Sequence, residues 1–403
     1  MSTLKVDAIR HNSATSDAIT TAADGTCTAK LTSIGGGGLS HRNLIINGAM
    51  NVSQRGTSST VDGYGCIDRF RSNISGNDEA PTQSQVDVAS GTSPYSLGFR
   101  KAFRMTNGNQ TSGAGTTDVL CILHRMEAQD IANSGWNYTD SNSKITLSFW
   151  CKSSVAQVFY GYLRTKDGTE QLYPFQIGSL TANTWTKVTK TIPGNSNLQF
   201  DNNNDTGLDI EFLMYRGTDR TGSISLDAWG AYNSLVRVPD MTSTWYTTND
   251  ATFEITGVQL EVGDTATSFE HRSFAEELKR CQRYYYQVGG QTNDGAPDEP
   301  YGVLLPMAMC ASATRVKGVL QHPVPMRTGP TVSGGGSGTA TIQQGNNSPS
   351  TVLVYQDIWN ASNSSRYTWV DMSPNSGSIS NIGETGVVYA TNSTYHFKVT
   401  AEL

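Results

Sequence analysis

Short runs with apolar residues at every second position fill most of the chain. In Ile145–Ser153 the apolar residues Ile145, Leu147 and Phe149 show this spacing, which places their side chains on one face of an extended strand. Runs of the same kind recur at Val158–Thr165, Trp185–Ile192, Leu208–Gly217 and Phe253–Val262. Because no helical run separates these strands, the pattern predicts an antiparallel β-sandwich over residues 43–272.

A different pattern begins at Ser273. Its hydroxyl is placed to cap the first turn of a helix, and Glu276, three residues later, completes a capping box. The apolar positions that follow are spaced i, i+4, i+7 and i+11, as on one face of a helix: Phe274, Leu278, Cys281 and Tyr285. A helix this short is marginal by itself. We therefore expect a connecting helix over residues 273–288, whose apolar stripe packs on an adjacent domain or serves oligomerisation with sister chains.

The remaining segments divide the chain further. Residues 1–34 are too few and too polar to bury a core alone, so we expect either a disordered tail or an arm that needs a partner surface. Gly35–Gly38 indicates a flexible hinge over residues 35–42. Alternating runs resume beyond the helix, which predicts a second, smaller β domain over residues 289–403. The fold class expected for the whole chain is mainly β.

Composition and charge narrow the function classes. Charged residues make up 16% of the chain, and the formal net charge is −6 without any run of Lys or Arg, so nucleic acid is not an expected partner. No run of about 18 apolar residues occurs, which excludes a predicted membrane-spanning helix, and the first residues lack the apolar segment of a signal peptide. Synthesis in a cytoplasm is therefore expected. The six cysteines stand singly, which predicts reduced, mostly buried thiols and not a zinc site.

The sequence contains no motif of an established catalytic or cofactor site. A nucleophile elbow, a phosphate-binding glycine loop, a zinc-protease helix and a dinucleotide fingerprint are all missing, so we expect no catalytic residues and no cofactor. A structural Ca²⁺ ion is the exception, since Asp201, Asn203 and Asp205 alternate oxygen ligands as that ion requires. The alternative is a solvated turn, because the glycine falls at the seventh position of this loop and no Glu follows at the twelfth.

Aromatic residues in polar, turn-rich segments are the candidate sugar-binding side chains, because an aromatic ring can cover the apolar face of a pyranose. The candidates are Trp136, Tyr138, Trp245, Tyr246 and Trp359. Packing as a lid or at a subunit contact is the alternative for each. Three other tryptophans lie in or beside strands and are assigned to the core: Trp150, Trp185 and Trp229.

Four separated segments together resemble the tail-fibre proteins of bacteriophages, including phages of marine bacteria. They are Asn43–Ser58, Tyr64–Phe70, Gly257–Tyr286 and His322–Ser333. The order of the strands before residue 272 also looks like that of jelly-roll carbohydrate-binding modules, which often hold a structural calcium. This second resemblance rests on pattern more than on identity, and it implies a jelly-roll sandwich that binds carbohydrate.

The resemblance implies a homotrimeric virion component that is made in the host cytoplasm. Its N-terminal arm would attach to a phage tail protein such as a nozzle, adaptor or baseplate, and its distal part would bind a host surface polysaccharide or lipopolysaccharide. One alternative is a glycan depolymerase, although the sequence lacks the repeats of about 20–30 residues that form long parallel β-helices. The other is a head fibre or capsid decoration protein.

Overall fold

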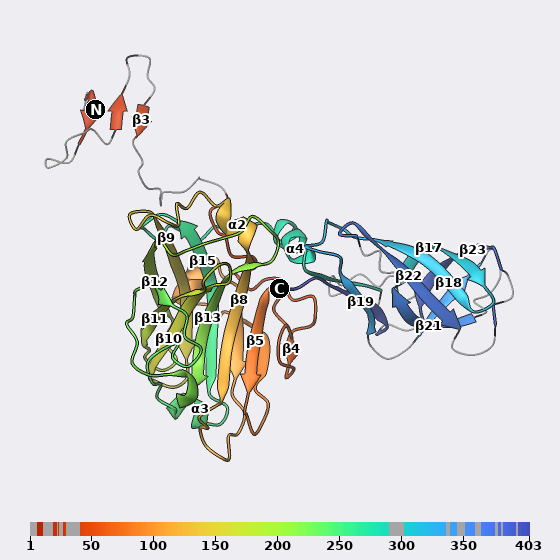
Figure 1. The fold of residues 1–403 in the computed structure, drawn as a ribbon, viewed down its shortest axis with the longest axis horizontal. Coiled ribbons are helices and arrows are strands. Elements are labelled where there is room, and N and C mark those ends of the chain that lie inside the picture. Colours follow the sequence, from red (N-terminus) through yellow and green to blue (C-terminus); the bar gives the residue numbers. More distant parts are fainter. Residues whose placement is uncertain are drawn as a thin grey trace.

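The computed structural model describes the chain in several stretches. They comprise residues 6–10, 19–21, 23, 27–29, 41–289, 302–335, 339–344, 351–358, 364–374, 378–379, 382–391 and 394–403. Within these residues, no helix is long and apolar enough to cross a membrane. The predicted mainly β fold is confirmed, with a sandwich, a connecting helix and a C-terminal β domain (Figure 1).

Two six-stranded antiparallel sheets form the sandwich. The first has the order β14-β11-β10-β13-β8-β5, with bounds β5 Phe70–Ser75, β8 Val119–Glu127, β10 Val158–Thr165, β11 Gln171–Ser179, β13 Thr206–Arg216 and β14 Gly230–Ala231. The second has the order β12-β9-β15-β7-β6-β4, with bounds β4 Ser58–Ser59, β6 Thr82–Asp87, β7 Lys101–Thr106, β9 Lys144–Ser153, β12 Thr186–Pro193 and β15 Thr252–Val262. Sheet neighbours far apart in sequence are typical of a jelly roll.

The core lies between these sheets, as the alternating pattern predicts. Ile145, Leu147 and Phe149 of β9 are completely buried, and the Phe149 ring packs edge-on against Phe212 of the opposite sheet with 4.9 Å between centroids. Short helical segments interrupt the strands of the sandwich: α1 Ser93–Ser96, α2 Ala128–Ala132, η1 Thr218–Arg220 and α3 Thr244–Thr247. In the arm, three short strands pair antiparallel and lie apart from the sandwich (Figure 1): β1 Ala8–Ile9, β2 Ile19–Thr21 and β3 Cys27–Ala29.

The C-terminal domain is a closed barrel with its own hydrophobic core. The barrel strands are β17 Val303–Ser312, β18 Arg315–Gln321, β20 Ala340–Gln343, β21 Thr351–Ile358, β22 Tyr367–Pro374 and β23 Thr385–Ala390. A three-stranded sheet stands between the barrel and the sandwich, made of β16 Tyr285–Val288, β19 Thr331–Gly335 and β24 His396–Thr400. The last strand of the chain therefore returns to the junction, where it pairs with β16.

The connecting helix, α4, spans Phe274–Gln282 and is shorter than predicted. Its cap is confirmed, because the hydroxyl of Ser273 accepts a hydrogen bond from the backbone N–H of Glu276. The prediction that Tyr285 continues the helical stripe is wrong, since Tyr285 opens strand β16. Three consecutive tyrosines, Tyr284–Tyr286, are buried there, and the backbone of Tyr285 and Tyr286 pairs with β24.

The helical stripe does not form one exposed oligomerisation surface. Cys281 is completely buried within the chain and Tyr285 is 4% exposed, whereas Phe274 is 59% exposed. Leu278 is half-buried between these extremes. The stripe thus packs mainly on this chain's own domains, which leaves Phe274 as its outward end. The predicted free thiols are confirmed for the five cysteines whose side chains are described, all of them buried: Cys66, Cys121, Cys151, Cys281 and Cys310.

Candidate functional site

A pocket of about 270 Å³ opens on the outer face of the sheet that contains β9, β12 and β15. Its apolar wall is formed by Phe99, Trp150 and Phe269, and its polar groups include those of Ser148, Lys187 and His271. We call it the Trp150 pocket. An aromatic wall with a few polar groups is the usual composition of a ligand site.

Strand geometry turns Trp150 outward. Its neighbour Phe149 points into the core, so Trp150, one position later, faces the other side of the sheet, where it is half-buried. In the strand register, Trp150 lies directly opposite Lys187 of β12 and Thr256 of β15. Trp150 thus packs against a small cluster with Phe99 on the outer face and does not belong to the core between the sheets, contrary to its assignment from the sequence. The alternation itself was the signal that could have found it, because it separates Trp150 from the buried face.

A polar row crosses the same face beside the pocket. Glu254 is 2% exposed, and its carboxylate accepts hydrogen bonds from Arg104 at 2.7 Å and from Lys152 at 2.8 Å. The Lys152 ammonium also lies 5.1 Å from the ring centroid of Trp185. Trp185 is half-buried on this face and does not belong to the core between the sheets, contrary to its assignment from the sequence.

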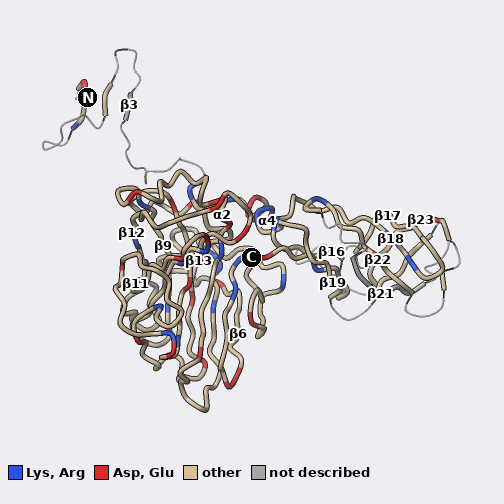
Figure 2. The backbone as a smooth tube through the Cα atoms, viewed as in Figure 1, with Lys and Arg blue, Asp and Glu red and all other residues tan. Residues whose placement is uncertain are grey.

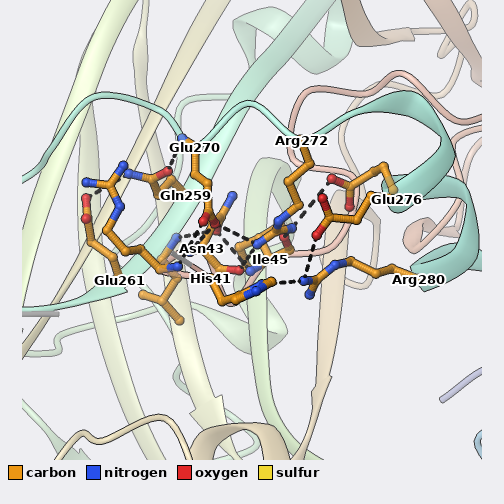
Figure 3. Close-up of polar contacts among 12 residues, drawn as sticks. His41, Asn43, Ile45, Gln259, Glu261, Glu270, Arg272, Glu276 and Arg280 are labelled. Carbon is orange, nitrogen blue, oxygen red and sulfur yellow. Dashed lines mark hydrogen bonds and ion pairs between the residues drawn. The ribbon is translucent and has the colours of Figure 1, made fainter. Parts of the chain in front are cut away.

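The loop from Asp264 to Arg272 forms one wall of the pocket. It is held by hydrogen bonds at Thr267 and Glu270, and the side chains of Gln259, Glu261 and Glu270 are drawn in Figure 3. Glu261 accepts hydrogen bonds from the backbone N–H and the hydroxyl of Thr267, at 2.9 and 2.6 Å. Glu270 donates its N–H to the side chain of Gln259 at 2.8 Å. These contacts hold the intervening residues over the sheet.

The same loop is anchored to the segment that follows the hinge. The Glu270 carboxylate accepts the backbone N–H of Asn43 at 3.0 Å, and Arg272 donates to the backbone carbonyls of Asn43 and Ile45 (Figure 3). Nearby, Arg280 of α4 hydrogen-bonds to His41 at 2.9 Å. These contacts order the loop before a ligand binds. Binding therefore costs less conformational entropy than it would with a loose loop.

His271 completes the rim of the pocket. Its Nε2 lies 2.9 Å from the carbonyl oxygen of Leu97, which only accepts, so Nε2 carries the proton. Its ring also packs near those of Phe99 and Phe269, with centroid distances of 5.1 and 4.9 Å. The orientation of the imidazole is thus fixed by its neighbours, and Nδ1 is left as the second polar atom of the ring.

Most of the aromatic residues predicted to bind sugar are in the core instead. Trp245 and Tyr246 are completely buried, because the single turn of α3 directs both rings inward while the threonines around them meet solvent. The Trp245 indole N–H donates to the carbonyl of Thr252 at 3.0 Å, and the Tyr246 hydroxyl donates to Asp118 at 3.1 Å. Burial raises the pKa of Tyr246. Neither ring is available to a ligand.

The other three residues predicted to bind sugar differ in their surroundings. Trp136 is 3% exposed and donates its indole N–H to the carbonyl of Ser143, so its prediction as a loop platform is wrong for the same reason. Tyr138 is half-buried, with its ring 5.0 Å from that of Phe200. Trp359 lies outside the described residues. The predicted candidates are therefore not brought together into one site.

The predicted calcium loop contacts the C-terminal domain. Arg327 donates to the backbone carbonyl of Asn204 at 2.8 Å and lies 3.7 Å from the carboxylate of Asp205. Asn203 uses its side-chain oxygen to accept the N–H of Asp205, and the third candidate ligand, Asp201, is exposed. Among the described residues, no group of three or more His, Cys, Asp or Glu side chains could hold a metal ion. Calcium binding by Asp201, Asn203 and Asp205 stays a prediction.

A second hollow, of about 1080 Å³, lies between the outer face of the barrel and the junction residues Gln282, Tyr286, Gln287 and Val288. Large apolar side chains are exposed on this outer face of the barrel, including Met307 at 70%, Met309 at 46% and Trp369 at 36%. Val319 of β18 lies directly opposite Trp369 of β22 and is also exposed, at 39%. Figure 2 shows few charged residues along the barrel. We call this surface the apolar barrel face.

Comparisons with known proteins give only distant likenesses. No family model matches the chain, and no curated protein matches it. Similar solved structures include the enzymatically active domain of tailspike protein 4 of bacteriophage CBA120, at 10% identity and a TM-score of 0.30, over 55% of this chain and 21% of that one.

Two further solved structures are similar to about half of the chain. A putative sugar binding protein from Bacteroides thetaiotaomicron is matched over 55% of this chain and all of that one, at 12% identity and a TM-score of 0.28. The N-terminal cellulose-binding domain of a Cellulomonas fimi β-1,4-glucanase is matched over 53% and 100%, at 13% identity and a TM-score of 0.26. At these TM-scores the likenesses carry no conclusion about function.

Proposed function

We propose that the chain is a non-enzymatic bacteriophage tail fibre whose sandwich binds a host surface polysaccharide or lipopolysaccharide in the Trp150 pocket. The observation that carries the proposal is the half-buried Trp150 ring, which lies on an outer sheet face in a pocket that Ser148 and Lys187 also line. A pyranose has an apolar face that can stack on the indole of Trp150, and it has hydroxyls that can hydrogen-bond to Ser148 and Lys187. The four segments that resemble phage tail fibres support the phage assignment.

The pocket suits binding better than catalysis. Glycoside hydrolysis generally uses two carboxyl groups placed on either side of the scissile bond. Among the residues that the structure describes, no Asp or Glu lines the Trp150 pocket. The nearest acid of the polar row, Glu254, is engaged by both Arg104 and Lys152. We therefore assign no catalytic residue to this face. The lack of a free pair of carboxyl groups here disfavours the depolymerase alternative.

The N-terminal arm and the apolar barrel face serve attachment and assembly. Residues 1–34 attach the fibre to a tail protein, which places the protein in the virion. The apolar barrel face associates with sister chains in a homotrimer, since monomeric proteins rarely expose a contiguous apolar surface of this kind. Several shallow glycan sites on one particle then act together, which raises avidity without new contacts.

The test is replacement of Trp150 by Ala, with binding measured on an array of bacterial surface glycans and adsorption measured on host cells. Loss of a central aromatic contact costs about 2 kcal/mol or more, so binding should fall at least tenfold. Trp229→Ala is the matched control, because Trp229 is also half-buried but packs on Tyr173 outside the pocket. Glycan binding that survives Trp150→Ala in a folded variant would refute the proposed site.

A further inference from the structure

Lys187 stands at the Trp150 pocket without a carboxylate partner among the described residues. Its side chain is exposed, and the β12–β9 register places it directly across from Trp150 on the same face of the sheet. Two other lysines of this sheet do have a carboxylate partner, since Lys152 pairs with Glu254 at 2.8 Å and Lys101 pairs with Asp87 at 2.7 Å. Lys187 is thus a positive charge at a ligand-sized pocket.

The surroundings do not cancel this charge. No acidic residue in the described part of the chain lines the pocket, although the chain as a whole has a formal net charge of −6. A polyanion is therefore repelled by the protein in general, so specific binding of one requires a local positive site. The indole of Trp150 beside Lys187 supplies an apolar surface at the same place.

We propose that the pocket takes a sugar with an anionic substituent, whose ring lies on Trp150 while its negative group reaches the Lys187 ammonium. This inference rests on the proposed function, because it specifies the glycan class that the same pocket binds. A ring carboxylate, as in a uronic acid, and a sulfate ester present the same chemistry to Lys187. The neutral hydroxyls of that sugar would meet Ser148 and the polar rim.

The experiment compares anionic polymers with matched neutral ones. Affinity electrophoresis of the full chain uses polygalacturonate and alginate, each beside its carboxyl-reduced form, and dextran sulfate beside dextran. We expect at least one anionic polymer to bind more tightly than its neutral partner. Lys187→Gln should weaken that binding about fivefold, the upper value for an exposed ion pair, and added salt should weaken the wild type more than the variant.

Two control variants separate the possible outcomes. Lys101→Gln removes an equal charge from the same sheet and should leave binding unchanged, whereas Trp150→Ala should abolish it. Equal binding of a polymer and its neutral form, no effect of Lys187→Gln, or no binding of any anionic polymer would overturn the anionic specificity. If a neutral polymer still binds and depends on Trp150, the proposed function stands and only this inference fails. Anionic binding that is indifferent to Trp150→Ala contradicts both.

Discussion

Glu402 forms a buried ion pair with Arg69 across the two β domains. Arg69 is 1% exposed, and its guanidinium lies 3.5 Å from the ring centroid of Tyr284. The other carboxylate oxygen of Glu402 accepts from Arg55 at 2.9 Å. The chain end that follows β24 is thereby fastened to the sandwich.

Breaking this pair should destabilise the chain strongly. Glu402→Gln leaves the Arg69 charge buried without its anion, and removing one partner of a buried pair costs about 3–5 kcal/mol. Urea denaturation should therefore show a lower midpoint at an unchanged slope. Asp87→Asn, which breaks the exposed pair with Lys101, should leave the midpoint in place. An equal effect of both variants would mean that the junction pair does not stabilise the fold.

The stability of the chain should depend on the protonation of Asp68. Burial raises the pKa of Asp68 to about 6 in the folded chain, against about 3.9 for an unperturbed Asp. Because the folded state binds this proton more tightly, its contribution to stability is complete below pH about 4 and is lost as the pH rises through 6.

The variant Asp68→Asn lacks this proton equilibrium. Between pH 4 and 6, the free energy of unfolding of the wild type should fall by about 2 kcal/mol relative to that of the variant. Urea denaturation across this range measures the difference. Parallel stability curves for the two proteins would show that Asp68 does not titrate in this window.

Trp245 should behave as a core residue and not as a sugar platform. It is completely buried, so Trp245→Ala should cost about 3–5 kcal/mol on unfolding. Trp150→Ala should cost much less, because that ring is half-buried. Thermal melting of both variants, followed by glycan binding at a temperature where each is folded, checks the contrast. A Trp245 variant that melts like the wild type would restore this residue as a surface candidate.

The apolar barrel face should hold the sister chains together. Met307→Glu places a charge on this face at a position that is 70% exposed, so it should fold normally but shift the protein from a trimer to a monomer in sedimentation. Leu235→Glu is the matched control, because Leu235 is a 62% exposed apolar residue on the sandwich. A wild type that sediments as a monomer at micromolar concentration would contradict the assembly.

Local sequence determined the features that depend on near neighbours. The period of two in Ile145–Ser153 places Ile145 and Phe149 in the core, because side chains of a strand alternate between its faces. The cap at Ser273 follows equally from local chemistry, since its hydroxyl needs only the N–H of Glu276. Mainly β structure, one short connecting helix and buried free thiols could all be predicted in this way.

The tertiary structure alone decided which aromatic rings meet solvent. Alternation tells which side of a strand a side chain occupies, but not whether another element covers that side. Trp245 lies among polar neighbours and is nevertheless buried, whereas Trp150 lies in an apolar strand and lines a pocket. That pocket joins Phe99, Trp150, Lys187 and His271, which are far apart in sequence and are brought together by strand pairing and by the anchored loop.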